Sequence, residues 1–147
     1  MANPIWSNPI KAPEDTGVGV WRRRIPFDTT GLAAGTVPVV ALEKGCIPLR
    51  ASVRIETAFN AGTTNVLSLG TAAVPDSLVT SANAAAGTPG YKQGTGVDLG
   101  TELANDTQFF AKFTQTGTAA TAGVAEFIVE FVNPRNWAHY SNRSQGL

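Results

Sequence analysis

Residues 47–59 carry the pattern that most constrains the fold, because apolar and polar side chains alternate there without interruption. One set would face a core: Ile47, Leu49, Ala51, Val53, Ile55, Thr57 and Phe59. The other set would face water: Pro48, Arg50, Ser52, Arg54, Glu56 and Ala58. A strand turns successive side chains to opposite faces, whereas a helix would need apolar residues three or four apart. The segment is therefore predicted to be an antiparallel strand with one buried face.

Several other segments show strand patterns separated by turn residues, and none shows a long helical period. Pro38 within residues 36–43 cannot donate to a ladder, which predicts an edge or bulged strand there. About seven or eight strands predict an all-β antiparallel β-sandwich or jelly roll. Residues 18–134 would form this domain, between an extended arm at 1–17 and an irregular tail at 135–147. The further strands are expected at 20–28, 36–43, 66–71, 96–103, 107–115 and 124–132.

The last two strand segments are expected to form a hairpin whose loop is centred on Ala120. In that register Phe113, Ala111 and Phe109 face Phe127, Val129 and Phe131, which gives one aromatic inner layer. The opposite face then places Phe110 beside Ile128. Two apolar side chains on a face that should be wet would form a patch, which implies a partner or a covering segment.

The arginine triplet at 22–24 is predicted to divide between the two faces of its strand. Arg23 shares a face with Trp21 and Ile25, while Arg22 and Arg24 point the other way. Two interpretations remain open for this outward pair. The charges could be solvated groups that discourage edge-to-edge association, or they could contact an acidic patch of a partner.

Both ends of the chain hold large apolar side chains without a local periodic pattern. The arm has Ile5 and Trp6 among prolines, so it is either a tail with incidental hydrophobic residues or an arm that lies on a neighbouring subunit. The C-terminal tail has Trp137, His139 and Tyr140 between arginines, a composition typical of interfaces. The tail could contact a partner or fold back onto its own sandwich.

The composition excludes several function classes. Eleven basic residues balance eleven acidic ones, and charged residues are 15% of the chain against about 25% in average domains. We therefore expect no nucleic-acid partner, which would require a basic excess. The chain has one histidine, one cysteine and no nucleophile elbow or phosphate loop, so we expect no enzyme activity, cofactor or metal. No apolar run approaches the roughly 20 residues of a membrane span.

A family resemblance is carried by the strand "LRASVRIETAFN" at 49–60, the turn "AGTTN" at 61–65, "VLSLGTAA" at 66–73 and "VAEFIVEFVNP" at 124–134. In this order of elements, over residues 20–134, the chain resembles the jelly-roll decoration or cement proteins of tailed bacteriophage heads. The resemblance implies a non-enzymatic homodimer or homotrimer, made in the host cytoplasm, that sits on the outer surface of the virion. There it would bind the major capsid protein and bridge neighbouring subunits.

Two alternatives to this role stay open at the level of the sequence. One is a carbohydrate-binding sandwich, although the irregular loops at 72–106 offer only Tyr91 as an aromatic platform. The other is a tail-completion or head-completion protein with the same fold. The residues predicted to contact a partner or a second subunit are Ile5, Trp6, Arg22, Arg24, Phe110, Ile128, Trp137, His139 and Tyr140.

Overall fold

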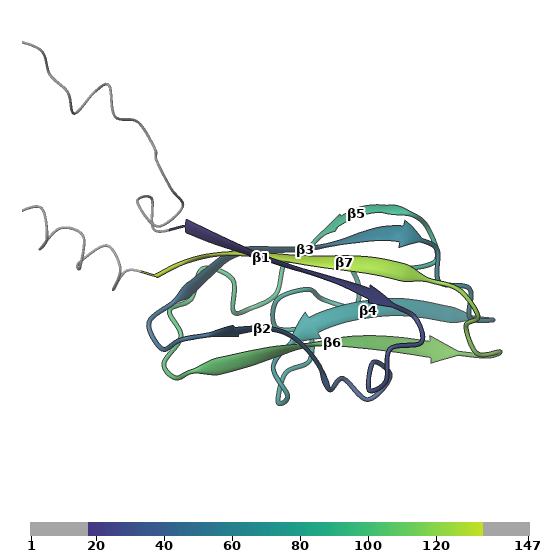
Figure 1. Ribbon diagram of the computed structural model, residues 1–147, viewed down its shortest axis with the longest axis horizontal. Coiled ribbons are helices and arrows are strands. Elements are labelled where there is room, and N and C mark those ends of the chain that lie inside the picture. The colour runs from purple at the N-terminus through teal and green to yellow at the C-terminus, as the bar shows by residue number, and fades with distance from the viewer. Residues whose placement is uncertain (1–17, 134–147) are drawn as a thin grey trace, which may run out of the picture.

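The computed structural model describes residues 18–133, which form two antiparallel sheets packed face to face (Figure 1). The four-stranded sheet has the order β1-β7-β3-β5, and the three-stranded sheet has the order β2-β6-β4. No helix occurs within the described part, so the predicted all-β sandwich is confirmed. The strands are β1 (Val18–Pro26), β2 (Val37–Leu42), β3 (Ile47–Thr57), β4 (Thr64–Gly70), β5 (Gly90–Gln93), β6 (Thr107–Thr116) and β7 (Val124–Val132).

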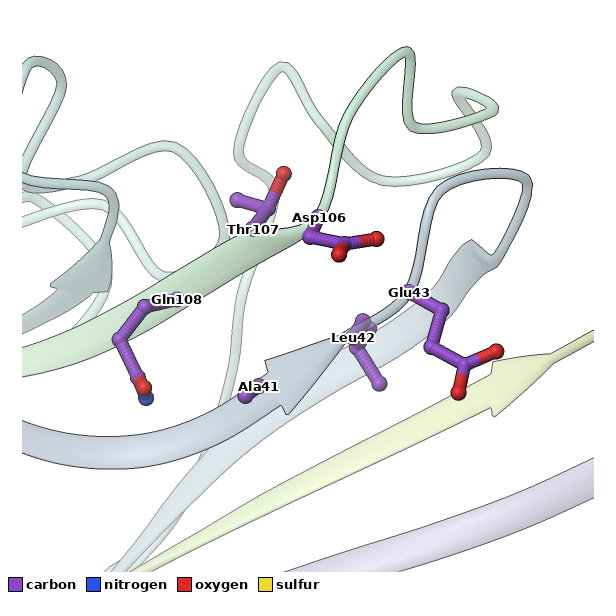
Figure 2. A pocket seen from close by; sticks show the side chains of 6 residues that line it. All are labelled: Ala41, Leu42, Glu43, Asp106, Thr107 and Gln108. Carbon is purple, nitrogen blue, oxygen red and sulfur yellow. The ribbon is translucent and has the colours of Figure 1, made fainter.

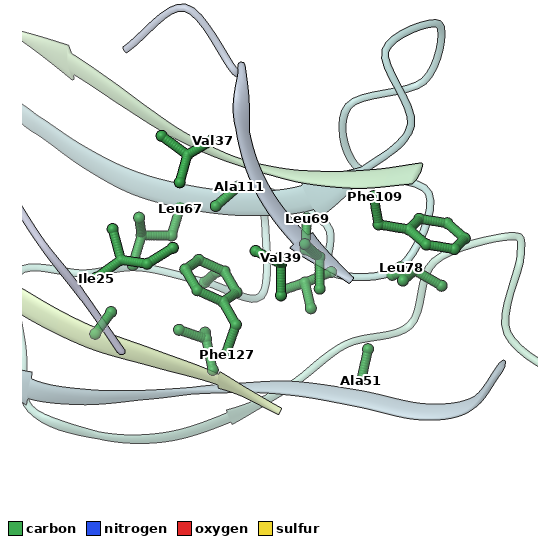
Figure 3. Packing of buried hydrophobic residues seen from close by; sticks show 14 of the residues in the cluster. Ile25, Val37, Val39, Ala51, Leu67, Leu69, Leu78, Phe109, Ala111 and Phe127 are labelled. Atoms are coloured by element: carbon green, nitrogen blue, oxygen red, sulfur yellow. The ribbon is translucent and has the colours of Figure 1, made fainter. Parts of the chain in front are cut away.

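The core fills the space between the two sheets with the inward residues of the alternating strands (Figure 3). Phe109 and Ala111 of β6 and Leu67 and Leu69 of β4 enter it from one sheet, and Phe127 of β7 enters it from the other. The aromatic rings of Phe59 and Phe113 also meet inside, with centroids 4.6 Å apart. The turn after Phe59 returns the chain to this same core, as the sequence predicts for a sheet corner.

The predicted hairpin between the last two strand segments is wrong. β6 pairs with β2 and β4, whereas β7 pairs with β1 and β3 in the other sheet. The connection at 117–123 crosses from one sheet to the other, so the two strands face each other across the core. Phe110 and Ile128 consequently lie on opposite outer faces of the sandwich and form no common patch. The alternation within each strand had the correct phase, but its pairing partner was misassigned.

A β-bulge near the start of β3 reverses the predicted direction of three side chains. The register with β7 shifts between Pro48 and Arg50, so Leu49 is an extra residue without a direct partner. As a result Pro48 is buried, while Ile47 is half-buried opposite Val132 and Leu49 is 47% exposed. Ile47 and Leu49 were expected inside the core and Pro48 outside, and the bulge accounts for each reversal.

The sheet edges agree in part with the sequence prediction. β2 is an edge strand with a bulge between Pro38 and Val40, as Pro38 predicted. The strand expected at 96–103 is absent, and the short β5 pairs with β3 instead. Residues 94–103 still follow the edge of β3, but single backbone hydrogen bonds separated by turns hold them there, so no ladder forms. These bonds run from Gly94 N to Ala51 O, Gly100 N to Pro48 O and Leu103 N to Cys46 O.

Candidate functional site

Both ends of the described chain lie at the same end of the sandwich. Val18 at the start of β1 pairs with Val132 at the end of β7, and Val132 also pairs with Ile47 of β3. The end of β2 and the start of β6 lie at this same end (Figure 1). We call it the terminal end. It is where the described strands leave most apolar surface uncovered.

The outer face of the four-stranded sheet is a lattice of arginine and glutamate. Arg22 donates from Nε and Nη2 to the two carboxylate oxygens of Glu126, both at 2.9 Å. The bidentate geometry is the strongest form of this ion pair. The Nε atom of Arg24 lies 2.7 Å from Oε2 of Glu56, and Nε of Arg50 lies 3.5 Å from Oε2 of Glu130. These ion pairs connect β1 to β7, β1 to β3 across β7, and β3 to β7.

The bidentate pair shifts the pKa of both partners. The hydrogen bond from Arg22 lowers the pKa of Glu126, against the opposing effect of its burial, and nearby arginines lower it further. The same hydrogen bond raises the pKa of Arg22. Both groups are therefore charged at neutral pH. The side chain of Arg22 is 59% exposed while that of Glu126 is only 12% exposed, so the guanidinium lies over the carboxylate and faces the solvent.

Arg54 is the cation of this face that has no ion pair of its own among residues 18–133. Its register neighbours are Glu126 on one side and Tyr91 on the other. Tyr91 is 55% exposed, so a guanidinium and an aromatic ring lie next to each other on open surface. Four arginines share this face with three glutamates, which leaves it slightly cationic.

Next to the charged lattice, at the terminal end, the same outer face becomes apolar. Val18 and Val20 continue the row that begins with Arg22, and Val20 is 54% exposed. Isolated exposed valines are common, but neighbours on adjacent strands form a contiguous surface. We call this surface the outer apolar patch. Its members are Val18, Val20, Ile47, Leu49 and Val132.

A groove of about 280 Å³ opens beside the patch, where edge strands β1 and β2 leave a gap between the two sheets. Trp21 points inward in register with the buried Val129, yet it is 52% exposed because the second sheet does not cover it. Farther along β1, Arg23 donates from Nη1 to the carbonyl of Pro38 and connects the two edges. We call this gap the β1–β2 groove. It is lined by Trp21, Val40, Ala41, Leu42, Glu43, Cys46, Phe131 and Asn133.

Phe131 reaches the groove because its neighbour in β1 is a glycine. A Cβ atom on Gly19 would lie 2.6 Å from Cζ of Phe131, so any larger residue would displace the ring. The ring packs against the core from the terminal end and forms part of the groove wall. The apolar character of this wall therefore depends on the pair Gly19 and Phe131.

A second hollow of about 330 Å³ adjoins the groove around the end of β2 and the start of β6 (Figure 2). The two hollows share Ala41, Leu42 and Glu43. The carboxylate of Asp106 accepts a hydrogen bond of 2.9 Å from the backbone N–H of Lys44, so Asp106 is used to hold the loop. Glu43, in contrast, makes no ion pair within residues 18–133. An unpaired carboxylate thus stands at the rim that both hollows share.

The predicted contact residues divide into three groups. Arg22 and Arg24 lie together in the charged lattice, facing outward as predicted. Phe110, half-buried between Pro38 and Gly70, and Ile128, half-buried between Arg22 and Ser52, lie on opposite faces. The remaining predicted residues lie outside the described part of the chain: Ile5, Trp6, Trp137, His139 and Tyr140.

The outer apolar patch and the groove were not among the predicted contact sites, although the patch had a signal in the sequence. Val18 and Val20 stand at even spacing from Arg22, so the period of two already placed them on the outward face. Pro48 next to Leu49 signals an irregular strand start, where a bulge is common. The groove had no local signal, because it depends on which strands become edges.

No group of three or more His, Cys, Asp or Glu side chains in residues 18–133 is placed to hold a metal ion. Within the same residues there is no helix with the length and apolar character needed to cross a membrane. The outer apolar patch, the charged lattice and the β1–β2 groove are the candidate interaction surfaces of the described residues.

Comparison with known proteins connects this fold to phage capsids. No protein-family model and no curated protein matches the sequence. Among solved structures, a chain of the cyanophage Pam1 capsid asymmetric unit is similar with a TM-score of 0.62 and 22% identity, over 80% of this chain and 85% of that one. A chain of the acid-stable capsid of Helicobacter pylori bacteriophage KHP30 is similar with a TM-score of 0.58 and 12% identity, over 80% of this chain and 88% of that one. The expected likeness to phage head proteins is thus confirmed at the level of the fold.

Proposed function

We propose that this protein is a structural component of a phage particle, namely a decoration or cement protein on the outer surface of the capsid. The observation that carries the proposal is the shared fold: most of this chain superposes on chains from two phage capsid structures. In this role the protein has no catalytic activity. It binds the major capsid protein across subunit boundaries and stabilises the contacts between those subunits, as a homodimer or homotrimer.

The surfaces at the terminal end support a role in binding other protein. The outer apolar patch gives a contact area that would be desolvated, and the neighbouring arginines give it a polar rim. A hydrophobic centre with a polar rim is the usual anatomy of a protein interface. Such a contact repeated at many symmetric positions would convert a modest affinity per site into a durable shell. Arg54 and the ion-paired arginines would then face acidic groups of the capsid protein.

The direct test is co-sedimentation with assembled heads and, separately, with free capsid subunits. We expect the protein to sediment with assembled heads and not to bind free capsid subunits, because the binding site would exist only where subunits meet. Equal binding to free subunits would contradict a cement role. The copy number in purified particles separates the alternatives: hundreds of copies indicate a shell protein, whereas a handful indicate a tail or head-completion protein.

The contact surface is tested with charge substitutions of matched exposure. Val20→Glu combined with Leu49→Glu places two charges in the outer apolar patch, and we expect at least a tenfold loss of head binding. The matched control is Val74→Glu combined with Val97→Glu, because these two valines are 44% and 77% exposed but lie in loops outside the outer apolar patch and the charged lattice. Unchanged binding of the double variant, with the unfolding transition intact, would remove the patch from the proposal.

A further inference from the structure

We infer that the β1–β2 groove is the binding site for the C-terminal tail of the same chain, residues 134–147. The site takes an aromatic side chain together with a neighbouring cation, and Trp137 and Arg135 are the residues that supply them. This goes beyond the proposed function, because it selects one of the two roles open to the tail. The tail closes the sandwich edge of its own subunit.

The place where the described chain ends is the first argument. Asn133 is itself part of the groove lining, so the tail begins at the wall of the site. An extended chain advances about 3.3–3.6 Å per residue, which lets Arg135 reach about 7 Å and Trp137 about 14 Å from Asn133. Because Asn133 itself lines the groove, both side chains start within reach of its walls. A segment tethered at the site also has a far higher effective concentration there than a segment from another molecule.

The chemistry of the groove is the second argument. Its walls are apolar, with Val40, Leu42 and Phe131 beside an indole, Trp21, that is half exposed. Aromatic side chains bury large areas and pack well against such walls. The rim carries Glu43, which has no ion pair among the described residues. The tail has the complementary pattern, an arginine two residues and a tryptophan four residues after Asn133.

The N-terminal arm fits this groove less well than the tail. Val18, where the arm begins, is not part of the groove lining and faces outward in the outer apolar patch. The arm holds one cation, Lys11, and Lys11 is five residues away from Trp6. It therefore lacks the closely spaced cation and indole that the groove matches.

Disulfide trapping in the full chain tests the inference. The background variant is Cys46→Ala, which removes the native thiol. Ala41→Cys on the exposed groove rim is combined with Asn136→Cys in the tail, so Glu43, Arg135 and Trp137 stay intact. The matched control combines Asn136→Cys with Leu49→Cys, which is also exposed and next to the end of β7 but on the outer face.

We expect the groove pair to form an intramolecular disulfide at least tenfold faster than the outer-face pair under mild oxidation. Trp137→Ala and, separately, Glu43→Gln should each slow that reaction severalfold. Equal rates for the two pairs would overturn the inference, since the tail would then have no preferred position. Trapping only as a covalent dimer would also overturn it, because a neighbouring subunit's tail would occupy the groove.

A second measurement does not depend on engineered thiols. Trp6→Phe and Trp137→Phe keep an aromatic ring at both positions, so the tail can still dock while the emission of the protein comes from Trp21 alone. We expect deletion of residues 134–147 from this variant to shift the emission to longer wavelength and to increase quenching by iodide severalfold. Unchanged emission and quenching in a deletion variant that still unfolds cooperatively would contradict a docked tail. Neither readout involves capsids, so failure here leaves the proposed capsid role untouched.

Discussion

Gly123 supports the core at the point where the chain crosses from β6 to β7. A Cβ atom at this position would lie 2.5, 2.6 and 2.8 Å from three ring atoms of Phe59. The ring cannot retreat easily, because it is 2% exposed and packs against Phe113 at a centroid distance of 4.6 Å. Gly123 also has φ of +148°, a conformation that residues with a side chain rarely adopt. Gly123→Ala should therefore combine backbone strain with overpacking.

The two costs can be separated, because Gly90 supplies the backbone term alone. Its φ is +133°, but a Cβ atom there would meet nothing within 4 Å. Strain at such a backbone position costs about 1–3 kcal/mol, and overpacking a core adds about 1–3 kcal/mol. We expect Gly123→Ala to destabilise the protein by about 2 kcal/mol more than Gly90→Ala. In a domain of this size that difference corresponds to a melting temperature lower by about 4–8 °C.

Urea unfolding followed by circular dichroism measures both variants against the parent protein. The decisive comparison adds Phe59→Leu, which removes the ring that the new Cβ would strike. In that background the cost of Gly123→Ala should fall toward that of Gly90→Ala, which gives a coupling energy of about 1–2 kcal/mol. Equal destabilisation by the two glycine substitutions, or perfect additivity with Phe59→Leu, would refute the reasoning. The ring would then have room to move.

Three further predictions concern polar contacts and the core. Because Arg22 lowers the pKa of Glu126, the ion pair stabilises the folded protein above about pH 4.3, and this stability is lost as the pH falls through the lowered pKa. Glu126→Gln should therefore lower the urea midpoint at pH 7 but not at pH 2. The exposed control Glu102→Gln should show no such dependence on pH. Asn60 accepts hydrogen bonds from the backbone of Thr121 and Ala122, so Asn60→Ala should cost about 1 kcal/mol by urea unfolding, against little for Asn105→Ala. Leu69 is fully buried, so Leu69→Ala should cost about 3–5 kcal/mol, whereas Val74→Ala on an exposed loop should cost under 1 kcal/mol.

The period of two in the sequence predicted which face of most strands is buried. It placed Val53 and Ile55 inside, and Arg54 outside, without any knowledge of partners. It also placed Arg22 and Arg24 on the wet face and identified β2 as an edge or bulged strand. These are local properties: a side chain's face follows from its neighbours along one strand. The sequence of each strand was therefore sufficient to predict these faces.

Strand pairing and register were harder to predict from the sequence, because they depend on segments that are distant along the chain. The segments at 107–115 and 124–132 look like a hairpin, since they are adjacent in sequence and match in phase. Both phases are satisfied equally well when the strands lie in opposite sheets, and β2, β3 and β4 provide better neighbours. The error at Ile47 has a related cause. One extra residue inverts the phase of everything before it, and alternation alone cannot reveal where that residue falls.

The same bulge explains why the candidate surface lies at the terminal end. Without an extra residue, regular alternation through Leu49 would have kept Ile47 and Leu49 in the core, as the sequence suggested. The bulge instead turns Ile47 toward Val132 on the outer face and leaves Leu49 exposed beside it. β1 extends the apolar surface with Val18 and Val20 and, as an edge strand, leaves Trp21 open on its other side. One inserted residue and one edge strand therefore concentrate uncovered apolar surface where both chain ends depart, so an arm, a tail or a neighbouring subunit can reach it.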